Sequence, residues 1–393
     1  MKFLLLLTIF LLSNLSAQES KLDIKFFGTL GGVYNDNNKY IFTKGPHSKD
    51  GSSQDLNPYI DSILGTQATY KFNNDFSLIT QGIIRKNDFG KIKPSIDLGY
   101  LRYDSNENFI FKVGRIKLPY YKNSDNDNIG YSRLMIREPI EVYSQMPFNI
   151  YNGIEFIYSN IIDKYFYTIQ GNYGQEKFDI PIQTLDEEFK NEIKDLKAIN
   201  ITFGNDIVEA RASYLHGKIS TENSTINDIF DGLRLSGLND LANKYEMKDK
   251  NSEYFGLGLF IDYENFIFSS EYGKRKVDSF YLGTSGYYTT FGYRLGSLIP
   301  YFTYAKVKMD KDTSLKTVTA NNFMLNELLK IQNVAQDTKT FGFKYHINQN
   351  MDFKFEYQRI RPQGLNGGFN LNSTGNYENS NSNIYSFAID FVF

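Results

Sequence analysis

Short segments in which apolar and polar side chains alternate recur along the chain, from residue 24 to the last residue. Successive side chains of an extended strand point to opposite faces, so a period of two predicts strands with one apolar face. Sixteen segments follow this pattern, and they begin near residues 24, 64, 76, 96, 109, 154, 165, 199, 208, 255, 266, 287, 298, 340, 351 and 384. We therefore expect an all-β chain of sixteen strands.

The segment 351–357 has the clearest division between its two faces. One face would be apolar throughout, whereas the other would carry Asp352, Lys354 and Glu356. Charged side chains cannot fill a dry core unpaired. We therefore expect the charged face to look into water, and the apolar face to meet either lipid or a second sheet.

The connections between these segments decide between lipid and a second sheet. Brief polar turns fall at 73–75, 104–108, 205–206, 264–265 and 348–350, and they alternate with long excursions at 35–61, 116–150, 175–196, 217–252, 307–337 and 361–382. A transmembrane antiparallel β-barrel with short turns at one end and long loops at the other produces that rhythm. A β-sandwich has no reason to lengthen every second connection.

An even number of strands places both termini of the chain at the same end of the barrel. The last strand, 384–393, should then close the barrel against the first, 24–30. Its outward face would carry five large apolar side chains, namely Tyr385, Phe387, Ile389, Phe391 and Phe393. Helix-like periodicity within the long excursions also predicts short helices at 185–196, 226–245 and 321–332.

The N-terminus reads as a secretory signal peptide over residues 1–17. Lys2 precedes an apolar run that ends near Leu12, and small residues up to Ala17 follow it. This run is shorter than the ~20 residues that a spanning helix needs. We therefore expect residues 18–393 to form a single exported barrel domain. The chain has no cysteine, and its net charge of −2 argues against nucleic acid as a partner.

The region 98–156 contains the most distinctive residues of the chain. It reads Val113-Gly114-Arg115-Ile116-Lys117-Leu118-Pro119, then Gly130-Tyr131-Ser132, Arg137-Glu138-Pro139-Ile140-Glu141-Val142-Tyr143-Ser144, Pro147-Phe148 and Tyr151-Asn152-Gly153. In this stretch the chain resembles the sixteen-strand porins of the Gram-negative outer membrane. Elsewhere only the strand rhythm and the terminal phenylalanine agree with that family.

The resemblance implies a function and a location. The chain would form a water-filled channel in the bacterial outer membrane for passive diffusion of small hydrophilic solutes and ions. It would contact outer-membrane lipid and form a homotrimer. The loop after the fifth strand, 116–150, would fold inward and narrow the pore. The aromatic last residue, Phe393, would be the signal for barrel assembly.

Rings of charged side chains set the selectivity of such pores, and the chain offers both signs. Candidates for the constriction and the channel wall are Arg85, Lys112, Arg115, Lys117, Lys122, Asp125, Asp127, Arg133, Arg137, Glu138, Glu141, Glu155 and Arg211. Further wall candidates are Arg275, Arg294, Asp97, Glu209 and Glu271. Neither sign dominates, so no ion preference is predicted. The working hypothesis is that Arg115, Arg133 and Arg137 face the solute.

Two other classes of function fit a barrel. An adhesin or receptor would use the long loops, and a barrel enzyme would draw catalytic residues from distant strands, although no Gly-x-Ser-x-Gly elbow is present. The stretch from Asp125 to Gly130 hints at a calcium loop, but Ile129 and Ile136 occupy positions that need oxygen ligands. The three histidines are scattered. We therefore expect no metal and no cofactor.

Overall fold

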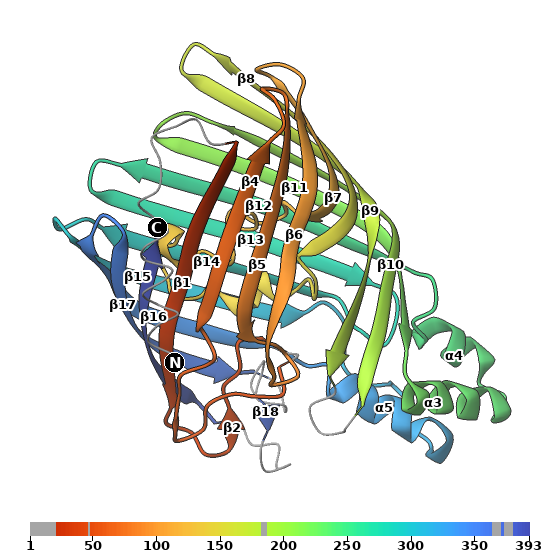
Figure 1. The fold of residues 1–393 in the computed structure, drawn as a ribbon. Coiled ribbons are helices and arrows are strands. Elements are labelled where there is room, and N and C mark those ends of the chain that lie inside the picture. The colour runs from red at the N-terminus through yellow and green to blue at the C-terminus, as the bar shows by residue number, and fades with distance from the viewer. Residues whose placement is uncertain (1–20, 46–47, 182–186, 364–370, 373–379) are drawn as a thin grey trace, which may run out of the picture.

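The computed structural model describes residues 21–393, except for 46–47, 182–186, 364–370 and 373–379. It is a closed antiparallel β-barrel of sixteen strands, as the sequence predicted (Figure 1). The barrel strands are β1 (Leu22–Asn35), β4 (Ile63–Lys71), β5 (Phe76–Lys86), β6 (Ile92–Asp104), β7 (Phe109–Lys117), β8 (Ile150–Ile162), β9 (Tyr165–Pro181), β10 (Glu188–Gly204), β11 (Val208–Glu222), β12 (Lys250–Tyr263), β13 (Phe266–Val277), β14 (Thr284–Tyr293), β15 (Leu298–Met309), β16 (Gln336–Asn348), β17 (Met351–Pro362) and β19 (Ser382–Val392).

Shorter elements lie in the loops between the barrel strands. They are the two-residue strands β2 (Tyr40–Ile41), β3 (Leu56–Asn57) and β18 (Leu371–Asn372), the 3-10 helices η1 (Gly130–Ser132) and η2 (Ala320–Asn322), and the helices α2 (Ile140–Tyr143), α3 (Ser224–Leu235), α4 (Asn239–Tyr245) and α5 (Phe323–Lys330). Among the described residues, no helix is both long enough and apolar enough to cross a membrane. The expected signal peptide, 1–17, lies outside the described residues.

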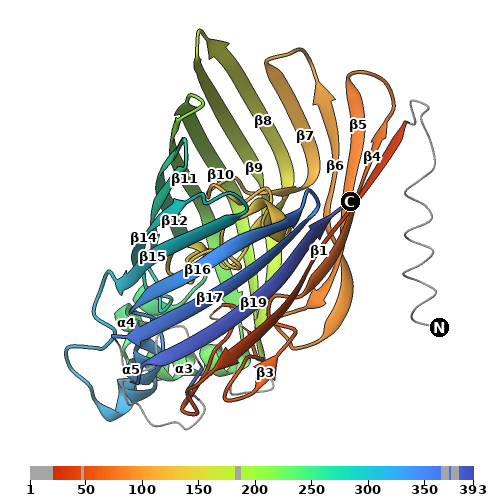
Figure 2. The same ribbon diagram turned by 90° about the vertical axis from the view of Figure 1, so that its left-hand side faces the viewer.

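The first and last strands close the barrel. β19 pairs with both β17 and β1, and Leu30 lies opposite Ile389 in the β1–β19 register. Figure 2 shows β1 and β19 side by side. Closure removes the unpaired edges that an open sheet would expose. The predicted contact between the last strand and residues 24–30 is confirmed.

The two faces of the strands differ as the alternation predicted. On β19, Tyr385 and Phe387 are exposed on the outer surface, whereas Ser386, Ala388 and Asp390 are buried inside the barrel. On β17, the side chains of Asp352, Lys354 and Glu356 point inward and are likewise buried. An apolar outer surface is the one that lipid would cover.

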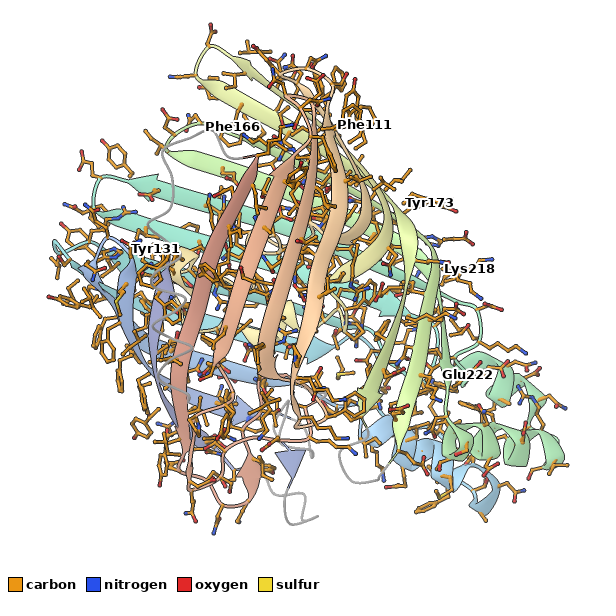
Figure 3. All side chains as sticks on the ribbon, viewed as in Figure 1. Phe111, Tyr131, Phe166, Tyr173, Lys218 and Glu222 are labelled. Carbon is orange, nitrogen blue, oxygen red and sulfur yellow. The ribbon has the colours of Figure 1, made fainter. Side chains whose placement is uncertain are left out.

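The two ends of the barrel have different connections. At one end, which we call the short-turn end, the strands are joined by brief turns such as 264–265 between β12 and β13. At the other, the long-loop end, α3, α4 and α5 pack together beside the barrel (Figure 1). The predicted helices at 226–245 and 321–332 are confirmed. In Figure 3, Phe111 lies toward the short-turn end, whereas Lys218 and Glu222 lie toward the helices.

The predicted helix at 185–196 is wrong, because β10 begins at Glu188 and most of this region is strand. Its pairing shifts register between Ile193 and Leu196, and Asp195 takes a positive φ of 49°. Such a bulge interrupts the period of two. As a result, the inward-packed Ile193 and Leu196 fall three residues apart, which imitates the spacing of a helix.

Candidate pore constriction

The loop between β7 and β8, residues 118–149, is called loop 3 here. It lies inside the barrel and follows the inner wall (Figures 1 and 2). This is the inward fold that the sequence predicted for 116–150. The first connection, residues 36–62 between β1 and β4, is called loop 1 and also contributes to the interior.

Apolar packing fixes one side of loop 3. Tyr121, Val142 and Met146 are buried in one cluster with wall residues such as Tyr254 and Tyr288. Helix α2 lies directly on β14, where a Cβ atom added at Gly286 would come within 2.3 Å of the carbonyl oxygen of Glu141. A residue with a larger side chain at 286 would therefore displace the helix. Loop 3 thus packs against the inner wall at β12 and β14.

Buried charges on β17 and β19 hold the opposite side of loop 3. The Lys354 ammonium lies 2.8 Å from the Asp390 carboxylate and donates to the carbonyl oxygens of Gly130 (2.8 Å) and Met135 (3.1 Å). A Cβ atom at Gly130 would lie 2.1 Å from Asp390 Oδ1 and 2.5 Å from Thr29 Oγ1, so this approach requires glycine. The tip of the loop is therefore seated on the wall.

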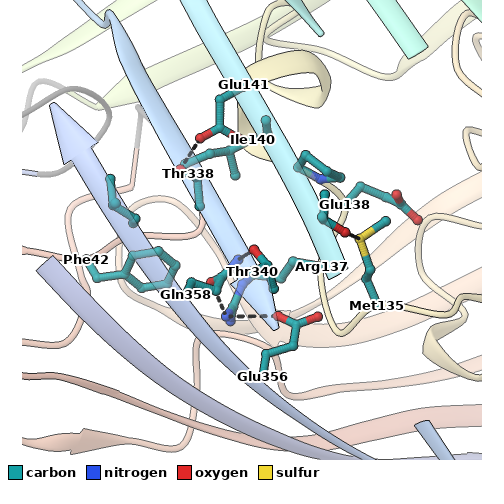
Figure 4. Close-up of a pocket in the computed structure, with 14 residues that line it drawn as sticks. Phe42, Met135, Arg137, Glu138, Ile140, Glu141, Thr338, Thr340, Glu356 and Gln358 are labelled. Atoms are coloured by element: carbon teal, nitrogen blue, oxygen red, sulfur yellow. Dashed lines mark hydrogen bonds and ion pairs between the residues drawn. The ribbon is translucent and has the colours of Figure 1, made fainter. Parts of the chain in front are cut away.

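Arg137 and Glu356 extend this attachment. The Glu356 carboxylate accepts hydrogen bonds from the Ile136 backbone N–H (2.7 Å) and the Tyr301 hydroxyl (2.6 Å). The Arg137 guanidinium donates to Gln358 (Figure 4). It also pairs with Asp61 of loop 1. Arg137 is only 6 % exposed. Its contacts make it a bridge between loop 3, loop 1 and the wall.

Glu141 also contacts the wall. Its carboxylate accepts hydrogen bonds from Gln336 (2.7 Å) and from the Thr338 hydroxyl, and its side chain is buried (Figure 4). Glu138 is buried too, and Asn123 donates to its Oε1 at 2.7 Å. Burial raises the pKa of the Glu138 carboxyl to about 7, although Arg133 favours its ionised form. Its Oε2 has no hydrogen-bond partner among the described residues.

Two predicted basic residues, Lys117 and Lys122, attach the beginning of loop 3. Lys117 lies 2.8 Å from both Asp97 and Asp127, and all three are largely buried. Lys122 pairs with Glu209, and its backbone N–H donates to Glu271. These contacts bring the predicted residues together in ion pairs.

Other predicted residues pair along the inner wall. Arg211 donates to the carbonyl oxygen of Pro119 at 2.5 Å, and Lys112 lies 2.6 Å from Glu155. Arg115 pairs with Glu176 at 3.1 Å, a carboxylate that the sequence analysis did not single out.

Three further candidates differ in their surroundings. Arg275 donates to the carbonyl oxygen of Gln145 in loop 3 at 2.8 Å. Asp125 is exposed on loop 3. Arg294 pairs with Asp262 next to a short turn, so the structure does not bring it to loop 3.

A cavity of 360 Å³ remains between loop 3, loop 1 and the long-loop end of β5. Arg85, Arg133 and Lys44 line it, together with loop 3 side chains such as Tyr143 and Asp127. Lys44 was not a sequence candidate, and neither were Asp61, Lys354 and Asp390. Nothing local in the sequence marks Lys44 or Asp61, because their neighbours here are distant along the chain. The charged face of 351–357 was the available signal for Lys354.

The described part of the chain contains no group of three His, Cys, Asp or Glu side chains arranged to hold a metal ion. The stretch considered for calcium uses its oxygens in other ways. Asp127 pairs with Lys117, and Asn128 Oδ1 accepts a hydrogen bond from Arg85. The cavity beside loop 3 is thus lined by fixed charges, among them Arg85, Arg133 and Asp127.

A closed sixteen-strand barrel with a loop seated inside it has the fold of the outer-membrane porins. No protein-family model matches the chain, and no curated protein matches it by sequence. Solved structures do match its fold. The trimer form of OmpT, an outer membrane protein of Vibrio cholerae, is 12 % identical, with a TM-score of 0.53 over 95 % of this chain and 99 % of the other.

Two further solved structures are similar over their whole length. OmpF of Salmonella typhi, in complex with daunomycin, is 12 % identical, with a TM-score of 0.53 over 95 % of this chain and 97 % of the other. An anion-selective porin from Comamonas acidovorans is 10 % identical, with a TM-score of 0.54 over 95 % of this chain and 99 % of the other. At these identities the likeness concerns the fold, and the resemblance noted over 98–156 is consistent with it.

Proposed function

We propose that the protein is an outer-membrane porin that forms a water-filled channel for passive diffusion of small hydrophilic solutes and ions. The observation that supports this most is the 360 Å³ cavity beside loop 3, lined by charged side chains from three separate parts of the chain. A barrel that served only as an anchor would need no such lining. The similar fold of two porins supports the same conclusion.

In this proposal the short-turn end faces the periplasm and the long-loop end faces the outside. Residues 1–17 direct export and are removed, and Phe393 takes part in barrel assembly. The candidate charges around loop 3 shape the passage. We also propose a homotrimer, because the fold is similar to that of a barrel solved in a trimer form.

Entry of solutes into liposomes tests the proposal. The purified barrel is reconstituted into vesicles that hold an impermeant polymer, the vesicles are diluted into isotonic neutral sugars of graded size, and swelling is followed by light scattering. We expect rapid entry of small sugars and a steep decline with size, because loop 3 narrows the passage. Folded barrels that admit no solute would contradict the proposal.

A receptor or adhesin is the second candidate, and exposed apolar side chains on the helices at the long-loop end favour it. Leu235 of α3 is 92 % exposed, and Phe323 and Met324 of α5 are more than half exposed. Binding activity in a barrel that admits no solute would support this alternative. A barrel enzyme would instead hydrolyse lipid or peptide substrates after reconstitution.

A further inference from the structure

Three cations in the channel have no carboxylate partner among the residues that the structure describes. Arg85 of β5 donates only to Asn128 Oδ1, at 3.4 Å. Arg133 of loop 3 donates to the backbone carbonyl of Asp127 at 3.1 Å, and its Nε has no partner. Lys44 of loop 1 is exposed to the cavity and makes no ion pair there.

Most of the carboxylates around the same cavity either pair with a cation or are buried. Asp61 is buried against Arg137, and Asp127 pairs with the buried Lys117. Asp50 pairs with Lys86, and Glu138 is buried beside Asn123.

One further carboxylate lines the cavity. Asp88, in the turn after β5, is exposed and accepts a hydrogen bond from the Ser48 hydroxyl at 2.7 Å. The charges that mobile ions can reach are therefore mainly positive.

The three cations come from loop 1, from the barrel wall and from loop 3, and so they approach the passage from different sides. Desolvation by the surrounding protein lowers the pKa of the Lys44 ammonium to about 8, and the nearby Arg85 and Arg133 guanidiniums contribute to this lowering. Solvated surface cations have no reason to converge in this way. Like charges held together without a counterion attract a mobile anion.

We propose that the channel prefers anions, and that Lys44, Arg85 and Arg133 form a weak binding step for small oxyanions such as inorganic phosphate. This inference depends on the proposed channel function. A guanidinium offers paired N–H donors that match an oxyanion, and an ammonium adds a compact charge. A narrow neck with fixed positive charge lowers the barrier for anions and raises it for cations.

The reversal potential tests this inference. The full-length barrel is placed in a planar bilayer with a tenfold KCl gradient and ~0.1 M salt on the concentrated side, where screening extends over about 10 Å. We expect the sign of an anion-selective channel. The variant K44Q/R85Q/R133Q should lose about twofold or more of the chloride-to-potassium permeability ratio.

A matched control separates local charge from net charge. The variant K177Q/K311Q/R359Q removes three exposed cations outside the cavity and should keep the wild-type ratio. Added inorganic phosphate should reduce chloride current through the wild-type and control barrels, and should do so much less in K44Q/R85Q/R133Q.

The outcomes distinguish this inference from the proposed function. A conducting barrel with a zero or cation-selective potential would overturn the anion preference alone. An equal loss of selectivity in both triple variants would show that Lys44, Arg85 and Arg133 do not set the anion preference. A folded barrel that carries no current would overturn the proposed function and the inference together.

Discussion

At the scale of single residues, a charged face that the sequence assigned to water holds a loop instead. Asp352, Lys354 and Glu356 do point into the barrel, as the alternation predicted. Each is buried, however: Lys354 and Glu356 bind the backbone of loop 3 directly, and Asp352 pairs with Lys344 on β16. The physical argument that charges need partners was sound, but for Lys354 and Glu356 the partner is a distant segment of the chain.

The substitution Lys354→Met tests this attachment. It would leave Asp390 and the carbonyl oxygens of Gly130 and Met135 without their cation, so we expect a loss of about 3–5 kcal/mol in the free energy of unfolding. Denaturant unfolding in detergent measures the loss. The double variant K354M/D390N should regain part of it, because no buried charge is then unpaired. Equal stability of K354M and the wild-type protein would show that the contact does not hold the loop.

The pKa shifts of two loop residues predict how selectivity changes with pH. Lys44, with a pKa of about 8, is positive at pH 6 and loses its charge as the pH rises. Glu138, with a pKa of about 7, is neutral at pH 6 and gains a negative charge over the same range. Both changes make the channel more negative, so the chloride-to-potassium permeability ratio should fall between pH 6 and pH 9.

Charged groups on several elements act on these two residues. Lys44 is affected by Arg85, Asp61, Arg133 and Asp127, whereas Glu138 is affected by Arg133, Glu271, Asn123 and Lys354. Reversal potentials measured across the pH range for the wild-type barrel and for K44Q/E138Q check the prediction. The variant should show a much flatter response. A ratio that rises with pH in the wild-type barrel would contradict the assignment.

At the scale of elements, strands were predicted better than loops. The period of two located all sixteen barrel strands, because each must present one face to the outside and one to the interior. It failed at β10, where a bulge between Ile193 and Leu196 broke the alternation. The path of loop 3 was predicted by family resemblance, but its contacts were not, because Arg137 and Asp61 are 76 residues apart.

The β1–β19 register gives a prediction at this scale. The chain has no cysteine, so a pair introduced at Leu30 and Ile389 is free to react only with itself. These residues lie opposite each other, and we expect rapid oxidation to a disulfide that shifts gel mobility. The pair Leu30→Cys and Tyr385→Cys, which is out of register, is the control and should not form the bond in the folded barrel. Cross-linking of the control alone would contradict the closure described here.

At the scale of the whole molecule, the barrel and loop 3 together enclose a cavity lined by charge. The sequence predicted the charged candidates on loop 3, but it could not say which of them would attach the loop to the barrel wall. Arg137 and Glu141 are buried against the wall, whereas Arg133 and Arg85 line the cavity. Lys44 completes that lining from loop 1 and has no local signal in the sequence. Only the closed barrel brings these three segments together.

Single-channel conductance of the purified barrel in a planar bilayer tests the central claim most directly. If loop 3 narrows an open, water-filled passage, the current should rise in discrete steps whose size increases with the conductivity of the bathing salt solution. The result that would contradict the account is a correctly folded barrel that inserts into the bilayer and yet shows no current steps.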